Sequence, residues 1–192
     1  LTFRFNNVVG TSDQATNLTS GPLQLRGSNR IGVQSMAFSN SFYGFKNTVR
    51  SFTGELNSNF KPNISNKLLA SYTYIQDTRT SPSDPFPFVD IWEGGDSYMS
   101  FGYELFTYNN DVVNKTFSLV NNTTINVNAH TFTLGASFDR LYFRNQYIRE
   151  GTSYYRYASV ADFLNSADPI GFGVTYGYNG VDAPGVELTF GL

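Results

Sequence analysis

The clearest pattern along the chain is an alternation of large apolar residues with small polar ones. In residues 117–125 and again in residues 132–138, most of the large apolar side chains are separated by an even number of positions: Phe117, Leu119 and Ile125, then Phe132, Leu134 and Phe138. A repeat of two predicts a β-strand, because a helix would repeat every 3.6 residues. Only residues 126–129 separate the two segments, so a hairpin with a tight turn is expected there. Its second strand runs on into a loop more than about ten residues long, which is long for an ordinary hairpin.

Other segments share this pattern and predict further strands. The predicted strands cover residues 1–5, 48–60, 67–77, 113–125 and 131–143, a short strand at 31–33, and an antiparallel pair at 170–178 and 186–192. Within the long connection 78–111, two aromatic segments at 88–92 and 98–103 are expected to form a hairpin around Glu93, Gly94, Gly95 and Asp96. The one helix predicted lies at 159–165, where Ser159 can cap the helix and Asp162 complements its positive end.

The predicted connections alternate between short and long. Residues 61–66 and 126–129 are short turns, whereas 6–29, 78–111 and the segment after residue 143 are long. Outer-membrane β-barrels sort their connections in this way, with short turns at the periplasm and long loops outside. The main strands are also close to the 9–11 residues, roughly, that a tilted strand needs to cross a bilayer. The pattern therefore predicts an all-β fold of antiparallel up-and-down strands, forming part of a large transmembrane β-barrel with long extracellular loops.

An isolated open sheet of this size would be unstable in a lipid bilayer. An unpaired strand edge leaves backbone groups without partners, at a cost of several kcal/mol for each group. The sequence also begins and ends inside alternating segments. Residues 1–192 are therefore expected to be one partial barrel segment of a longer chain, completed by the remainder of the same barrel.

Composition supports a surface that meets both lipid and water. Charged residues make up 15% of the chain and aromatic residues 17%, whereas charge in ordinary globular domains is nearer a quarter. The net charge of −2 argues against a nucleic-acid partner. Cysteine is absent, which excludes disulfides and thiolate metal sites. The same composition also fits a secreted β-sandwich, so an extracellular all-β binding or adhesion module, similar to a carbohydrate-binding sandwich, stays open as the alternative.

Several segments together resemble a known family. They are residues 52–58, 71–79, 86–87, 91–95, 130–135, 143–149, 153–155 and 159–164. These segments resemble the N-terminal part of the barrel in Oar-like TonB-dependent receptors of the Bacteroidota. The resemblance implies an outer-membrane barrel of about 22 strands with a plug in its lumen, opened by a TonB-type energy transducer. The plug domain and the rest of the barrel have no counterpart in this sequence.

The resemblance also implies a location and partners. The location would be the bacterial outer membrane, and the partners would be the lipid bilayer, the energy transducer acting through the absent plug, and a surface lipoprotein as a further candidate. The expected role is nutrient uptake or surface binding without catalysis.

Little in the sequence points to catalysis, a cofactor or a metal. His130 is the only histidine and no G-x-S-x-G motif accompanies it. Glycines 171, 173 and 177 are not followed by a helix, so no phosphate-binding loop is expected. The acidic residues of the long connection have no calcium-loop spacing and are interpreted as solvated charges: Asp77, Asp84, Asp90, Glu93 and Asp96. Asp139 and Arg140 are neighbours in a strand and should face opposite sides, Arg140 outward near the membrane edge.

Aromatic residues of the long connections are the best candidates for binding a ligand. Their amphipathic rings provide contact area at low entropic cost. The candidate residues are Trp92, Tyr98, Phe101, Tyr103, Tyr154, Tyr155 and Tyr157. Packing within the loops and an aromatic girdle at the membrane interface are expected to account for most of the aromatic residues.

Overall fold

The structure of the protein is a computed structural model that describes residues 1–16, 32–175 and 185–191. It contains a large sheet of six strands and a small sheet of five. The large sheet consists, in spatial order, of β1 (Thr2–Gln14), β3 (Tyr43–Lys61), β4 (Ile64–Thr80), β7 (Asp111–Val127), β8 (His130–Gln146) and β11 (Gly185–Gly191). Every pair in it is antiparallel, and the spatial order follows the chain order.

The small sheet is built from the long connections. Its spatial order is β10 (Gly171–Gly173), β9 (Tyr154–Tyr157), β5 (Phe88–Glu93), β6 (Asp96–Phe101) and β2 (Met36–Ala37). A 3₁₀ turn, η1 (Ser39–Ser41), follows β2, and one helix, α1 (Val160–Leu164), follows β9. The pairs β5 with β9 and β2 with β6 are parallel. Among the described residues, no helix is long and apolar enough to cross a membrane.

The two faces of the large sheet differ sharply in polarity. One row of paired residues across β1, β3, β4 and β7 reads Phe5, Phe52, Tyr72 and Phe117. The adjacent row, which points to the other side, reads Arg4, Thr53, Ser71, Ser118 and Asp139 across β1, β3, β4, β7 and β8. Side chains alternate between faces along a strand, so the sequence repeat of two becomes an apolar face and a polar face.

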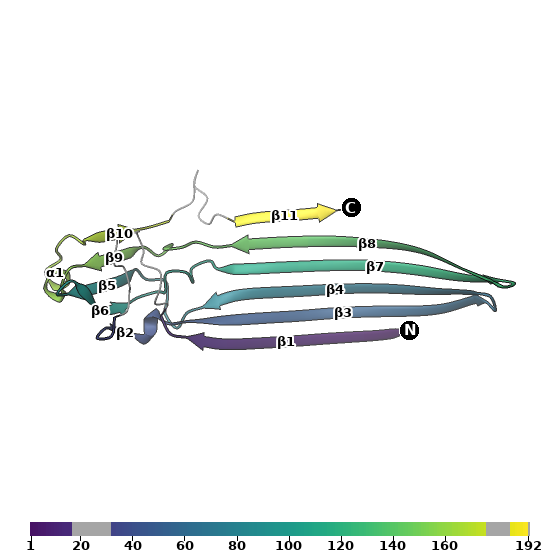
Figure 1. Ribbon diagram of the computed structural model, residues 1–192, viewed down its shortest axis with the longest axis horizontal. Coiled ribbons are helices and arrows are strands. Elements are labelled where there is room, and N and C mark those ends of the chain that lie inside the picture. The colour runs from purple at the N-terminus through teal and green to yellow at the C-terminus, as the bar shows by residue number, and fades with distance from the viewer. Residues whose placement is uncertain (17–31, 176–184, 192) are drawn as a thin grey trace.

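The connections are sorted between the two ends of the large sheet. Both tight turns, after β3 and after β7, lie at one end, while the small sheet and α1 lie at the other (Figure 1). Buried residues gather at the end of the small sheet, where Phe88, Leu105 and Tyr154 form a core cluster. The large sheet therefore presents long, uncovered faces, and the small sheet supplies the compact part of the molecule.

The structure confirms the predicted all-β fold with antiparallel up-and-down strands and a short loop helix. It also confirms the hairpin at 88–103, now β5 and β6, and the cap of α1, where the Ser159 hydroxyl accepts a hydrogen bond from the Asp162 N–H at 3.0 Å. Asp139 and Arg140 fall in rows of opposite faces, as predicted. Within the described residues β1 and β11 are the edges of the large sheet, so these strands form an open sheet.

Three sequence predictions were wrong. The segment 186–192 does not pair with 170–178: β11 pairs with β8, and β10 pairs with β9 in the small sheet. Residues 176–184, where the first of those predicted strands ends, lie outside the described residues. The first strand continues through the predicted loop to Gln14, because its backbone stays paired with β3 in spite of the low strand propensity of its residues. Gly32 to Ser35 form a turn and not the predicted strand, and the Ser35 N–H donates a hydrogen bond to the Gly32 carbonyl at 3.2 Å. Residue 31 lies outside the described residues.

Candidate binding surface on the small sheet

One face of the small sheet carries two groups of aromatic rings, a series of four and a separate pair. The ring centroids of Phe38 and Phe101 lie 6.1 Å apart, and those of Phe101 and Phe163 lie 5.6 Å apart. Tyr157 continues the series, with its ring 5.3 Å from that of Phe163. Tyr155 and Phe172 form a further pair at 5.0 Å. We call these six residues, Phe38, Phe101, Tyr155, Tyr157, Phe163 and Phe172, the aromatic strip.

Local structure explains why these rings gather on one side. Tyr155 and Tyr157 are separated by one residue on β9, so both point to the same face of the sheet. Phe163 reaches the same face from α1, whose start is fixed by the Ser159 cap. The strip stays partly open to solvent: Phe38 is exposed, Phe172 is 48% exposed, and the two tyrosines are half-buried.

The opposite face of the small sheet is buried and holds an ion pair. Asp90 on β5 and Arg156 on β9 are neighbours in the parallel register, and both side chains are 0% exposed. Arg156 Nε and Nη2 donate to Asp90 Oδ2 at 2.9 and 2.5 Å. The Tyr154 hydroxyl donates to the same oxygen at 3.0 Å. This arrangement satisfies the carboxylate oxygen in a site that water does not reach, as a buried charge requires.

Burial and the neighbouring carboxylate change the chemistry of Tyr154. Removal from water, followed by the negative charge of Asp90, raises the pKa of the Tyr154 phenol well above its ordinary value. Its ring stacks on Phe88 with centroids 6.0 Å apart. Arg156 also places its guanidinium carbon 4.4 Å from the centroid of the Trp92 ring, a cation–π contact. The buried face therefore supports the aromatic strip and holds β5 against β9.

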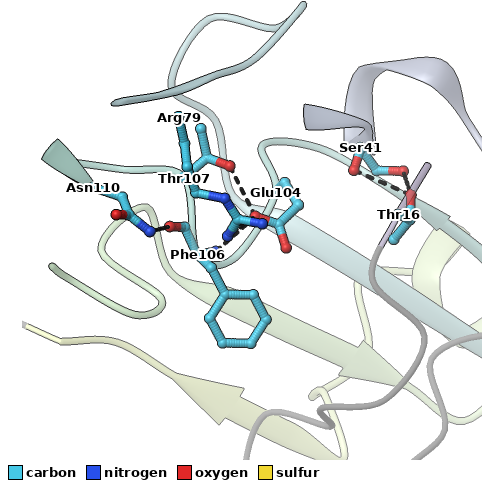
Figure 2. Close-up of polar contacts among 7 residues, drawn as sticks. All are labelled: Thr16, Ser41, Arg79, Glu104, Phe106, Thr107 and Asn110. Atoms are coloured by element: carbon cyan, nitrogen blue, oxygen red, sulfur yellow. Dashed lines mark hydrogen bonds and ion pairs between the residues drawn. The ribbon is translucent and has the colours of Figure 1, made fainter. Parts of the chain in front are cut away.

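A second charged network joins the small-sheet end to the strands of the large sheet. Glu104 is fully buried, and its Oε2 accepts from the Thr107 hydroxyl at 2.8 Å and from the Phe106 N–H at 2.9 Å. Arg79, at the end of β4, lies 3.4 Å away through its Nη1 (Figure 2). The Arg79 guanidinium carbon also lies 3.8 Å from the centroid of the Tyr43 ring.

Hydrogen bonds at β1 add to this joint. The Thr16 hydroxyl, just after β1, donates to the Ser41 carbonyl at 3.1 Å, and both residues are buried (Figure 2). The loops of the small-sheet end are thereby fixed to two strands of the large sheet, β1 and β4.

The structure separates the seven candidate ligand residues into groups. Phe101, Tyr155 and Tyr157 belong to the aromatic strip. Tyr154 is fully buried, so its position is that of a core residue. Trp92 packs on Arg156, and Tyr103 is half-buried beside Tyr108, with its pKa raised by burial and by Glu104. Tyr98 is exposed on β6, beside the register irregularity between Ile91 and Trp92. Ligand binding by these residues stays a prediction.

The interpretation of Asp90 as a solvated loop charge was wrong. Its strand is brought against β9, 66 residues further along the chain, where Arg156 neutralises it. Reasoning from the sequence also missed Phe38, Phe163 and Phe172 as members of the strip. Phe163 lies in the helix predicted at 159–165 and Phe172 in the strand predicted at 170–178, but neither prediction indicated a contact with the other rings.

The described residues offer no constellation typical of metal binding. No three His, Cys, Asp or Glu side chains among them gather in a way that could hold a metal ion. His130 is the first residue of β8 and lies at the end of the large sheet that carries the tight turns. Its ring centroid is 6.2 Å from that of Phe132. The aromatic strip offers ring surface for stacking and the phenol groups of Tyr155 and Tyr157, which suits a ligand with a flat or partly apolar surface. A scan against protein-family models and searches of curated proteins and of solved structures each found no match.

Proposed function

We propose that the chain is a segment of a TonB-dependent outer-membrane receptor that serves nutrient uptake or surface binding without catalysis. In this proposal the large sheet is part of a transmembrane β-barrel, completed by the remainder of that barrel. The small sheet lies on the extracellular side and presents the aromatic strip to a ligand. An energy transducer acts through a plug domain that is not part of these residues, and a surface lipoprotein is a further candidate partner.

The observation that carries the proposal is the uncovered apolar face of the large sheet. Phe52 in the middle of β3 is 57% exposed, and Leu134 on β8 is 66% exposed. Phe3, Phe5, Phe117 and Phe138 on the same face are exposed as well. A contiguous apolar surface of this kind marks contact with a membrane or another apolar partner. In a bilayer, lipid chains would cover these side chains, while the polar face would line a watery lumen.

Strand length and the sorting of connections support the same proposal. β3 has 19 residues, and β4, β7 and β8 have 17 each. These lengths exceed the roughly 9–11 residues that a tilted strand needs to cross a bilayer. The strands can therefore span the membrane and continue beyond it toward the small sheet. The tight turns at one end and the long connections at the other match the two sides of an outer-membrane barrel (Figure 1).

The alternative of a self-contained β-sandwich receives less support from this arrangement. In a sandwich, two sheets pack face to face and bury their apolar faces against each other. Here the small sheet lies at the end of the large sheet and leaves the length of the apolar face bare (Figure 1).

Single-cysteine spin labels on β7 test the proposal. Residues 1–192 contain no cysteine, so each introduced cysteine is the only labelling site among them, and any cysteine in the rest of the barrel is first replaced by serine. Phe117→Cys and Leu119→Cys place the label on the apolar face, and Ser118→Cys and Val120→Cys place it on the polar face. In the complete barrel that contains this chain, inserted into lipid vesicles, we expect labels at 117 and 119 to collide with lipid-soluble oxygen and labels at 118 and 120 with a water-soluble nickel complex. A chain that stays monomeric in water, or four labels with equal accessibility, would contradict the membrane function and favour the binding module.

A further inference from the structure

We propose that the apolar face of the large sheet carries a binding site for the phosphate group of a membrane lipid, formed by Arg50, Lys115 and Arg140. The site rests on the proposed function, because it requires this face to meet lipid. It lies toward the small-sheet end of the strands, and the lipid is therefore one of the leaflet on that side.

Strand register brings the three cations together. Arg50 on β3 pairs with Tyr74 on β4, Tyr74 with Lys115 on β7, and Lys115 with Tyr142 on β8. These four residues form one row across four neighbouring strands, with all side chains on the apolar face. Arg140 lies one step further toward the tight turns, in the row of Phe117. Its long side chain can extend along the sheet toward the row of Arg50 and Lys115.

The charges of these cations are not neutralised by nearby carboxylates. Within the described residues, the ion pairs are formed by Lys67, Arg79, Arg144, Arg149 and Arg156. None of the three cations of the proposed site belongs to one of these pairs. Arg50 Nε donates to the neutral amide oxygen of Asn7 at 3.3 Å. Lys115 Nζ lies 4.7 Å from the centroid of the Tyr142 ring. Asp111, the acidic residue on this face of β7, is already paired with Arg144.

The position along the strand matches the headgroup region of a bilayer. An Arg or Lys on the lipid face costs roughly 2–4 kcal/mol at the midplane and about 0–1 near the interface. The row of Arg50 and Lys115 therefore belongs at the interface, where Tyr74 and Tyr142 are also favoured. Toward the tight turns the same face carries no Lys or Arg from Gly54 to Phe60 on β3 or from Leu119 to Ile125 on β7. The next cation on this face is Lys61, which pairs with Ile64 at the turn after β3. The row of Arg50 and Lys115 is thus separated from Lys61 by most of the length of the strands, and it marks the leaflet on the side of the small sheet.

The chemistry of the row selects a phosphate-bearing lipid. Lys and Arg donors form short, charge-assisted hydrogen bonds to phosphate oxygens, and Arg can do so with two parallel donors. The row on the tight-turn side of Arg50 and Lys115, which includes Phe52 and Phe117 beside Arg140, provides rings on which the acyl chains of the same lipid would lie. A free anion would use the cations but not these rings.

Electron spin resonance of spin-labelled lipids tests the site. The complete barrel that contains this chain is reconstituted into phosphatidylcholine vesicles that contain spin-labelled phosphatidic acid or spin-labelled phosphatidylcholine, and the fraction of motionally restricted lipid is compared. We expect phosphatidic acid to be preferred by at least about fivefold, the effect of a single Lys or Arg near an anionic surface. In Arg50→Gln/Lys115→Gln the preference should fall close to one, and Arg140→Gln should weaken it in part.

A matched variant and a competitor make the result decisive. Arg4→Gln/Lys67→Gln removes the same number of positive charges from the polar face and should keep the preference. Excess inorganic phosphate should leave the preference for phosphatidic acid unchanged. If inorganic phosphate abolished this preference, the three cations would form a general anion site, and the assignment to a lipid would be overturned. Equal restriction of both lipids by the unmodified chain would overturn this site alone. Failure to restrict either lipid would instead contradict the proposed membrane function.

Discussion

At the scale of single residues, the buried pair of Asp90 and Arg156 decides whether the small sheet holds together. Both side chains are withdrawn from water, which costs several kcal/mol for each ion unless the partners compensate. The compensation comes from the two guanidinium donors and the Tyr154 hydroxyl on one carboxylate oxygen. Such a pair tolerates joint replacement by apolar residues better than the loss of one member.

We therefore predict that Arg156→Met destabilises the small sheet by roughly 3–5 kcal/mol, because the Asp90 carboxylate loses its guanidinium partner in a buried site. Asp90→Leu/Arg156→Met, which removes both charges, should recover much of this loss. Trp92 is the only tryptophan and stacks on Arg156, so its fluorescence during urea unfolding reports on this region. A double variant as unstable as the single one would contradict the explanation.

Tyr154 gives the small sheet a dependence on alkaline pH. Its pKa is raised by burial and by Asp90, so the folded protein keeps the proton at pH values where an unfolded tyrosine, with a pKa of about 10, loses it. This contribution to stability is present below about pH 10 and declines as the pH rises above it. We expect the urea midpoint from Trp92 fluorescence to fall more steeply between pH 8 and pH 11 in the unmodified protein than in Tyr154→Phe. Equal slopes would refute this role.

At the scale of elements, β4 and β7 carry a small polar group within the apolar face. Asn66 Nδ2 donates to Asn121 Oδ1 at 3.0 Å and to Thr123 Oγ1 at 2.8 Å, and Asn121 Nδ2 donates to Asn66 Oδ1 at 3.2 Å. Leu68 follows Asn66 on the same face of β4. In contact with lipid, these amides would find no water, so the reciprocal bonds explain why they are tolerated there.

A double-mutant cycle on Asn66→Leu and Asn121→Leu tests this explanation. Each single change leaves the other amide without its partner, whereas the double change leaves an apolar contact. We predict a coupling free energy of roughly 0.5–2 kcal/mol, measured by urea unfolding of the full chain in detergent micelles. The pair of Glu55 and Asn57 on the polar face, joined at 2.8 Å, serves as the control and should couple more weakly because water replaces its bond. Additive effects of the two Asn66 and Asn121 changes would contradict the explanation.

At the scale of the whole molecule, the joint between Arg79 and Glu104 sets the position of the loops relative to the large sheet. Residues 102–110 connect the small sheet to β7, and Glu104 fixes this connection to the end of β4 (Figure 2). The carboxylate is fully buried and the guanidinium is nearly so. Loss of the charge should therefore affect the joint and leave the strand pairing of the large sheet intact.

We predict that Glu104→Gln speeds amide hydrogen exchange by about tenfold or more at Phe106 and Thr107, since a buried charged hydrogen bond contributes about 1.5–3 kcal/mol. Exchange in the centre of β3 and β4 should stay as in the unmodified chain. Glu55→Gln, which removes a more exposed partner of Lys67, should change neither region. Faster exchange throughout the large sheet after Glu104→Gln would show that the joint supports the whole fold instead.

The sequence by itself determined the features that depend on neighbouring residues. The repeat of two determined which residues of β3, β4, β7 and β8 share a face, because side chains of a strand alternate by geometry. Short polar turns determined the two hairpins, and Ser159 with Asp162 determined the start of α1. These local signals were enough for the fold class and for three of the six rings of the aromatic strip, Phe101, Tyr155 and Tyr157.

Only the tertiary structure decided which distant segments meet. β11 joined the edge of β8, and β5 paired in parallel with β9, because backbone edges take whichever partner the fold brings within reach. That pairing buried Asp90 with Arg156 and placed Tyr154 in the core, although a proline-rich, acidic connection had predicted solvated charges. Burial and charge pairing depend on contacts across 66 residues of chain, and no pattern within a single strand encodes such contacts.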